Sequence, residues 1–219
     1  MNHVRSRIRE AALAAGRDPG SVTLVAVTKS KPAESVRAAA TAGVTDFGEN
    51  YLQEALVKLD LLGDLDVRWH FIGALQSNKT RAVAERFSWV HSIDRFSVAR
   101  RLSEQRPFHA PPINLCIQVA LVREATKGGA DPGALAALAA QIRELPRVRL
   151  RGLMCVPPPQ PTTAAERALF SRLRILLDEL NGVGFGLDTL SMGMSADYES
   201  AIAEGATHVR IGTALFGSR

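Results

Sequence analysis

The stretch TLVAVTKSKPAES (residues 23–35) decides between two α/β folds. Its first half is rich in β-branched and apolar residues, which is typical of a buried strand, and its second half enters a helical pattern. A doubly wound open sheet that binds a dinucleotide carries a glycine-rich turn after its first strand. The turn here, KSKPAES, contains no glycine. This favours the other arrangement of parallel strands, a closed barrel.

Strand patterns repeat along the chain with helical patterns between them. The further strand patterns cover residues 44–50, 67–73, 88–94, 113–121, 149–156, 188–193 and 207–212, and helical patterns include 33–43, 131–145, 162–180 and 195–205. Such alternation indicates parallel strands joined by right-handed crossovers. With the first strand the pattern matches a (β/α)8 TIM-type barrel. A doubly wound open sheet remains the alternative.

We expect one domain over residues 1–219. An amphipathic pattern over residues 2–15, ended by Gly16, predicts an additional helix within residues 1–16 that packs on the barrel. No linker rich in Pro, Gly or Ser divides the chain. The segment VPPPQPTT (156–163) follows a strand pattern, so we expect it to form a loop at the mouth of the barrel.

The composition is that of a globular protein, with 46% hydrophobic and 22% charged residues. The net charge of +5 suits an anionic partner, but the arginines are spread along the chain, which favours solvated faces over a nucleic-acid surface. A small anion such as a phosphate ester suits the charge equally well. We therefore expect a small-molecule ligand and no nucleic acid.

Neither the cysteines nor the histidines are spaced for a metal site or a disulfide framework. Cys116 and Cys155 lie in separate apolar stretches, and the five histidines have no ligand spacing with carboxylates or cysteines. We expect a reduced, cytoplasmic protein without a metal. A signal peptide and a membrane span are not expected, because no segment reaches about 18 uncharged apolar residues.

Barrels build their sites at the carboxyl ends of the strands. Polar or glycine residues stand at or near such ends in several of the predicted strands, so we expect them to converge: Lys29, Asn50, His70, Asp94, Gly193 and Arg210. Asn50 and His70 would contact a ligand or satisfy backbone groups within the barrel. The residues alone leave both roles open.

Lys29 ends the first strand in phase with Val25 and Val27. A lysine with a pKa near 10.4 is neutral about once in 2,500 molecules at pH 7, so covalent chemistry requires desolvation or a neighbouring cation. A barrel mouth beside Arg210 would offer both. The alternative is a solvated charge that ends a buried strand. Lys31 precedes Pro32, a good first helical position, so we expect Lys31 to leave the site with the loop.

The C-terminal quarter contains residue types that bind phosphate. Ser195 is expected to cap a helix whose first turn holds Asp197, and Gly212 and Thr213 leave the last strand and open a short apolar segment. Barrels often bind phosphate between the loops after strands 7 and 8 and a short extra helix, where backbone N–H groups are free. Gly193 would complete such a cradle. Turn glycines and an ordinary helix cap are the alternative.

Six blocks of the sequence, in order and spacing, resemble the pyridoxal phosphate homeostasis protein family, which is similar to the N-terminal barrel of alanine racemase. The blocks are LVAVTKSKP, FGENYLQEA, WHFIGALQSNKTR, HSID, RGLM and LSMGMSADYESAIAEGATHVRIGTALFG. The likeness covers nearly the whole chain from about residue 22. The first and last blocks contain Lys29 and the glycines of the cradle.

The resemblance implies a barrel that holds pyridoxal 5′-phosphate as a Schiff base on Lys29. The resemblance also implies that Arg210 would face the pyridine nitrogen and that Asn50 and His70 would lie around the ring. The phosphate would be held by Ser195, Gly212 and Thr213. The family acts in vitamin B6 and amino-acid homeostasis and is not known for robust turnover. We therefore expect a carrier or buffer, a monomer, with apo forms of pyridoxal-dependent enzymes as recipients.

The alternative function is a pyridoxal-dependent amino-acid racemase with Lys29 as one base. An arginine at the pyridine nitrogen disfavours its protonation and weakens the ring as an electron sink. Racemisation also requires a second acid or base on the opposite face of the substrate. The tyrosines of the chain are Tyr51 and Tyr198, and neither stands in a block that suggests this role.

The sequence departs from the family pattern at three places. Ala74 stands where a histidine is usual, and Cys155 where a small residue such as alanine is commoner. Residues 120–126 replace a more acidic, glycine-containing segment before Lys127 and Gly128. These departures concern the rim of the site rather than the lysine or the phosphate cradle.

Overall fold

The strands of the chain close into a parallel barrel. In the computed structural model, which describes residues 1–122 and 128–217, each strand pairs with the next and β1 pairs with β8. The strands of this described part are β1 (Thr23–Val27), β2 (Asp46–Glu49), β3 (Arg68–Phe71), β4 (Trp89–Ile93), β5 (Ile113–Gln118), β6 (Val148–Met154), β7 (Thr189–Ser191) and β8 (His208–Ile211). The prediction of a TIM-type barrel is confirmed, and the open sheet is excluded.

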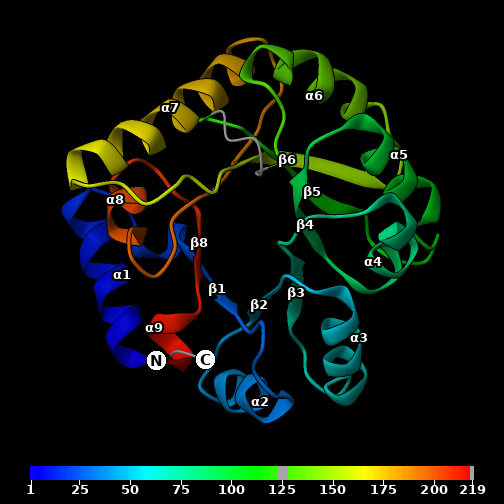
Figure 1. Cartoon of the computed structure of the whole chain (residues 1–219), viewed down its shortest axis with the longest axis horizontal. Coiled ribbons are helices and arrows are strands. Elements are labelled where there is room, and N and C mark those ends of the chain that lie inside the picture. Colours follow the sequence, from blue (N-terminus) through cyan, green and yellow to red (C-terminus); the bar gives the residue numbers. More distant parts are fainter. Residues whose placement is uncertain (123–127, 218–219) are drawn as a thin grey trace.

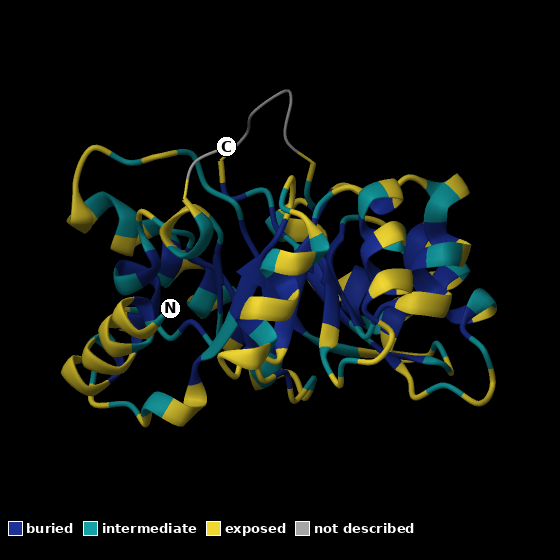
Figure 2. Ribbon diagram, turned by 90° about the horizontal axis from the view of Figure 1, so that it is seen from below, coloured by how far each residue is buried: buried dark blue, intermediate teal, exposed yellow. Residues whose placement is uncertain are grey.

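Helices surround the barrel as a ring (Figure 1). They are α1 (Asn2–Ala14), α2 (Ala33–Thr41), α3 (Leu52–Leu61), α4 (Thr80–Arg86), α5 (Phe96–Gln105), α6 (Leu135–Arg143), α7 (Thr163–Gly182), α8 (Tyr198–Ala203) and α9 (Thr213–Phe216), with 3-10 turns at Pro19–Ser21, Ser77–Lys79 and Pro132–Ala134. The outward faces of the helices are exposed, while the strands are mostly buried (Figure 2). This is the layering expected when parallel strands are covered by crossover helices.

The N-terminal helix α1 packs on the outside of the ring, as its amphipathic pattern predicts. Its buried residues are Val4, Ile8 and Ala12, which recur at helical spacing. On its outer side Arg7 Nε lies 2.6 Å from Glu199 Oε1, which ties α1 to α8. The helix therefore covers one side of the last β/α unit.

Two separate groups of buried apolar side chains hold the fold together. The larger lies between the strands and the helices and includes Phe47, Phe71 and Phe170. The smaller consists of Trp89, Cys116 and Met154, with Val156 packed against it. Since side chains alternate along a strand, the second group fills the inside of the barrel. The interior is a packed core, and a cavity opens at its carboxyl end.

No helix in the described ranges, 1–122 and 128–217, is long and apolar enough to cross a membrane. The longest, α7, has 20 residues and carries arginines and carboxylates along its length. Its cap follows the expected chemistry, because Thr162 Oγ1 accepts from the N–H of Ala165. The proline-rich segment before α7 leads away from β6, and its first residue, Val156, reaches the cavity described next.

Candidate functional site

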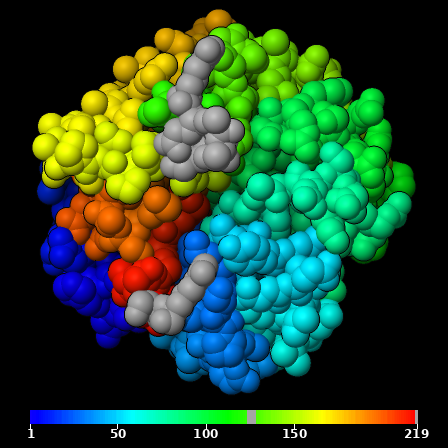
Figure 3. Space-filling model, in the orientation of Figure 1, coloured from blue at the N-terminus to red at the C-terminus, as the bar shows by residue number. Residues whose placement is uncertain are grey.

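A cavity of about 360 Å³ opens at the carboxyl ends of the strands. Its lining consists of Val27, Lys29, Lys31, Asn50, Ile72, Val156, Met194, Ser195, Ala196, Arg210, Gly212, Thr213 and Gly217. Residues of β1 and β8 thus meet residues that follow β1, β2, β3, β6, β7 and β8 in one place. In the space-filling view the red C-terminal segment lies against the blue segment that follows β1 (Figure 3). Six of the predicted residues converge here: Lys29, Asn50, Ser195, Arg210, Gly212 and Thr213. The expectation for Asp94 is wrong, because it does not line this cavity and its carboxylate pairs with Arg95 over 2.6 Å instead.

Lys29 stands two residues after the end of β1, and its side chain is exposed at the cavity. Lys31 lines the same cavity, and its Nζ donates to the carbonyl oxygen of Phe216 over 3.0 Å. Our expectation that Lys31 leaves with the loop is therefore wrong. The reason is that α2 begins at Ala33, so Lys31 still belongs to the rim and bridges to the end of α9.

Ser195 joins the two loops that form the predicted phosphate cradle. Its Oγ accepts from the backbone N–H of Gly212 and of Ala214, both at 3.3 Å. Our expectation that Ser195 caps the helix before Gly205 is wrong, because the N-cap residue of α8 is Asp197. The Asp197 carboxylate accepts from the N–H of Met194 over 2.6 Å instead. The Ser195 hydroxyl therefore serves the start of α9.

Gly193 does not line the cavity but shapes the turn that leads to Ser195. Its φ of 91° lies in the left-handed region, and a Cβ there would stand 2.6 Å from Cβ of Ala201. Its carbonyl oxygen accepts from the N–H of Arg210 over 2.9 Å. Glycine is required by both conformation and space. Its role is to connect the β7 loop to β8.

Arg210 is buried inside the barrel mouth and lines the cavity. Its Nη1 donates to Ser191 Oγ over 2.7 Å and its Nη2 to the carbonyl oxygen of Cys155 over 2.8 Å. Burial lowers the pKa of the guanidinium, which nevertheless keeps its charge because an arginine starts so high. The remaining N–H groups are available to a ligand.

Burial also raises the pKa of the Cys155 thiol to about 12, so that thiol stays protonated.

His70 lies inside the barrel and is absent from the cavity lining. Its ring stacks on Trp89 at 5.5 Å between centroids, and both of its nitrogens are engaged. Nε2 lies 2.9 Å from Asp46 Oδ1, and Nδ1 lies 2.9 Å from His91 Nε2. The geometry does not place His70 beside a ligand in the cavity. The sequence predicted His70 near a strand end. The register of β3 places its side chain one layer further into the barrel than the residues that line the cavity.

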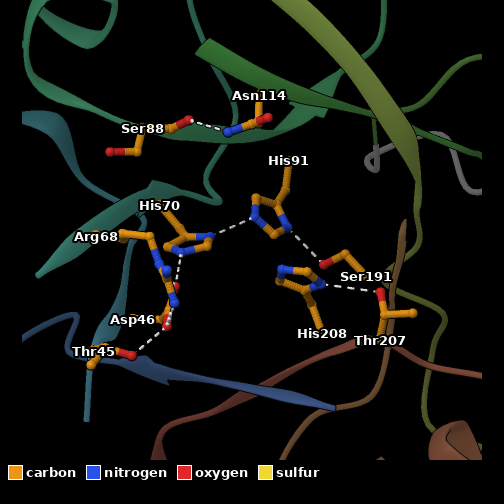
Figure 4. Close-up of polar contacts among 10 residues, drawn as sticks. All are labelled: Thr45, Asp46, Arg68, His70, Ser88, His91, Asn114, Ser191, Thr207 and His208. Atoms are coloured by element: carbon orange, nitrogen blue, oxygen red, sulfur yellow. Dashed lines mark hydrogen bonds and ion pairs between the residues drawn. The ribbon is translucent and has the colours of Figure 1, made fainter. Parts of the chain in front are cut away.

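A chain of hydrogen bonds runs from Asp46 through His70 and His91 to Ser191 (Figure 4). Ser191 continues it to Arg210, whose Nη1 donates to the serine hydroxyl. Burial lowers the pKa of His70 and sets that of His91 well below its usual range, so both rings are neutral at pH 7. The carboxylate can only accept and the guanidinium can only donate. Each neutral ring therefore carries its proton on Nε2, and every donor in the chain points from Arg210 toward Asp46.

The far end of this chain is anchored at the opposite mouth of the barrel. Burial raises the pKa of Asp46, but hydrogen bonds from Arg68 and His70 outweigh it and hold the pKa below its usual range. Arg68 reaches both carboxylate oxygens at 2.7 Å. The sequence analysis missed Asp46, His91 and Ser191. The sequence could have indicated them only through side-chain alternation, which points all three into the barrel. No spacing in the sequence links them to one another.

The departures from the family pattern lie at or beyond the edge of the site. Ala74 is exposed and does not line the cavity. Of the segment 120–126, residues 123–126 lie outside the described part of the chain, as does Lys127. Cys155 contributes its backbone carbonyl to Arg210 rather than its thiol.

Comparison with known proteins connects this geometry to a family. The model of the alanine racemase N-terminal domain matches residues 1–219. The pyridoxal phosphate homeostasis protein of Pseudomonas aeruginosa is 62% identical over 216 residues, which is 99% of this chain and 93% of that protein. The protein of the same name from Escherichia coli K12 is 47% identical over 222 residues, 100% of this chain and 95% of that one.

Solved structures agree with this. PipY of Synechococcus elongatus PCC7942 with pyridoxal phosphate bound has a TM-score of 0.84 and 42% identity, and covers 96% of this chain and 100% of its own. Alanine racemase from Corynebacterium glutamicum, at 18% identity and a TM-score of 0.70, shares the fold over 62% of its length. The chain belongs to the pyridoxal phosphate homeostasis protein family, which carries the alanine racemase N-terminal domain.

Proposed function

We propose that this chain binds pyridoxal 5′-phosphate covalently on Lys29 and acts in the cytoplasm as a carrier or buffer in vitamin B6 and amino-acid homeostasis. The observation that carries the proposal is the cavity itself. Lys29, the hydroxyl residues Ser195 and Thr213, and the buried Arg210 line one space of about 360 Å³. This is within the range of pockets that hold small ligands.

An unsatisfied polar atom indicates that the cavity is built for a ligand. Asn50 lines it, and its Oδ1 is buried without a hydrogen-bond partner among the described residues. Such an atom costs free energy unless a ligand or water satisfies it. The residues present therefore fit a polar aromatic cofactor with a phosphate.

Each residue of the cavity has a chemistry that suits a different part of the cofactor. Lys29 would hold the cofactor covalently through its amine, as a Schiff base. Ser195, Gly212 and Thr213, which line the cavity at the start of α9, would hold the phosphate. Arg210, which only donates, would face the pyridine nitrogen and disfavour its protonation. The bound cofactor supplies an electron-withdrawing ring, which this arrangement keeps weak.

The relatives support this proposal. Two are named for pyridoxal phosphate homeostasis, and PipY has been solved with pyridoxal phosphate bound. We further propose that residues 1–219 act as a single, monomeric domain and that apo pyridoxal-dependent enzymes receive the cofactor. Comparing transfer of bound cofactor to apo-enzymes with supply of free cofactor would test the last point.

Borohydride reduction followed by peptide mass mapping tests the covalent site. The adduct should appear on the peptide containing Lys29, be lost in Lys29→Ala and persist in Lys31→Ala. The Lys31 variant is a matched control because that lysine lines the same cavity. An adduct on another lysine, or no adduct, would contradict the proposal.

A carrier should turn over amino acids slowly. Neither Tyr51 nor Tyr198 is among the described residues that line the cavity, so no tyrosine there offers a second acid or base. Exchange of Cα hydrogen for solvent deuterium in a panel of amino acids measures this. Exchange at roughly 1 to 1,000 per second would be ordinary enzyme turnover and would favour a racemase instead.

A further inference from the structure

The backbone that presents Lys29 forms a tight turn. The N–H of Lys31 donates to the carbonyl oxygen of Thr28 over 3.0 Å, which places Lys29 and Ser30 at the tip. Ser30 has a φ of 59°, in the left-handed region that non-glycine residues rarely adopt. A serine in this conformation must be held there by its surroundings.

Three side chains from the neighbouring β2–α3 unit hold this turn on both sides of Lys29. The Nζ of Lys58 donates to the carbonyl oxygen of Thr28 over 2.6 Å, and Glu49 Oε1 accepts from the Thr28 hydroxyl over 2.6 Å. On the other side, Glu54 Oε1 accepts from the N–H of Ser30 over 2.5 Å. The residues before and after the lysine are thus fixed, while the lysine side chain is exposed at the cavity.

One buried ammonium connects these three contacts. Besides the Thr28 carbonyl, Lys58 Nζ lies 2.8 Å from Glu49 Oε1 and 2.6 Å from Glu54 Oε1. All three of its N–H groups are therefore used. The side chains of Lys58 and Glu49 are 5% and 0% exposed, so the bond between them forms away from water. Charged hydrogen bonds in such surroundings define geometry strongly.

We propose that Lys58, together with Glu49 and Glu54, is a positioning group for Lys29. This inference rests on the proposed function. None of the three is among the described residues that line the cavity, so they act on a ligand only through the turn that carries Lys29. The triad sets where the Lys29 amine stands relative to the cradle. It therefore controls covalent capture of an aldehyde rather than general affinity for the cofactor.

Two ligands that differ at one group test this role. Pyridoxal 5′-phosphate carries the aldehyde that Lys29 captures, whereas pyridoxine 5′-phosphate carries an alcohol and binds without a covalent bond. Affinities for both are measured on the full chain for Glu54→Ala, the double variant Glu49→Gln/Lys58→Met, and the control Gln53→Ala, an exposed neighbour on α3. The double variant avoids leaving Glu49 as a buried charge without its cation.

We expect both triad variants to bind pyridoxal 5′-phosphate roughly tenfold or more weakly, as loss of a charged hydrogen bond implies, and pyridoxine 5′-phosphate within about twofold of the wild type. Unchanged affinity for the aldehyde, or an equal loss for both ligands, would overturn the inference. If circular dichroism shows the double variant unfolded, Glu54→Ala decides, because Glu54 is part-exposed. If the wild type itself forms no adduct on Lys29, the proposed function fails instead.

Discussion

Arg210 Nη1 donates to the hydroxyl of Ser191 over 2.7 Å, and the same hydroxyl lies 2.7 Å from His91 Nδ1. This serine therefore joins the arginine of the cavity to the buried histidines of the barrel. Its hydroxyl can do so because it accepts one bond and donates another. The orientation of Arg210 depends on groups that no ligand in the cavity would touch.

Replacing Ser191 with alanine should disturb both stability and binding. The change leaves His91 Nδ1 without its donor and removes one partner of Arg210, so we expect a loss of about 1–3 kcal/mol in the free energy of unfolding. Cofactor affinity should fall as well, because the guanidinium is less fixed. Urea denaturation and cofactor titration measure the two effects. Ser103→Ala removes another buried hydroxyl, on α5, and should leave cofactor affinity unchanged.

The buried neutral histidines should make stability fall in acid. Burial sets the pKa of His91 well below its unfolded value near 6.5, with His70, His208 and Arg210 lowering it further. Its contribution is present above the unfolded pKa and is lost as pH falls, because only the unfolded chain then binds the proton. We expect His91 alone to account for a loss of about 2 kcal/mol between pH 7.5 and pH 5.

Urea denaturation at the two pH values measures this dependence. His91→Gln should reduce the pH-dependent loss by about 2 kcal/mol, whatever its effect on stability at pH 7.5. His109→Gln changes an exposed histidine and should keep the wild-type dependence. An unchanged pH dependence in the His91 variant would contradict the assignment of a neutral buried ring.

Removing the cation of the Lys58 triad should strongly destabilise the fold. Lys58→Met leaves the carboxylate of Glu49, which is 0% exposed, without its partner. We expect a loss of about 3–5 kcal/mol in the free energy of unfolding, and recovery of much of it in Glu49→Gln/Lys58→Met. Arg81→Met breaks an exposed pair with Glu85 and should change stability by less than about 0.5 kcal/mol. A small loss of unfolding free energy in Lys58→Met would contradict this expectation, because it would show that the Glu49 carboxylate is not left as an unpaired buried charge.

Gly193 and Gly184 offer a comparison of space with backbone conformation. Both have a positive φ, of 91° and 89°, but a Cβ at Gly193 would stand 2.6 Å from Cβ of Ala201, whereas no atom lies within 4 Å of one at Gly184 among the described residues. Gly184→Ala should cost about 1–2 kcal/mol from conformation alone. Gly193→Ala should cost a further ~1–3 kcal/mol from crowding. Equal losses in urea denaturation would mean that the β7 loop simply moves.

The sequence predicted the fold well because its information is local. Alternation of strand and helix patterns, and the lack of glycine after the first strand, indicated the barrel. Positions at strand ends brought Lys29, Asn50 and Arg210 to one mouth, since all parallel strands end on the same side. The short apolar segment after Gly212 forms a helix, α9.

What the sequence by itself determined is therefore the set of strand ends and the residues they carry. Only the tertiary structure decided which polar groups meet, because register and closure set those distances. His91 and Ser191 touch across 100 positions, and Ser195 serves a helix that begins at Thr213 instead of the one that follows it directly. Lys58 reaches the turn of Lys29 because α3 packs beside β1 and β2. Such contacts depend on packing between distant segments, which no local period encodes.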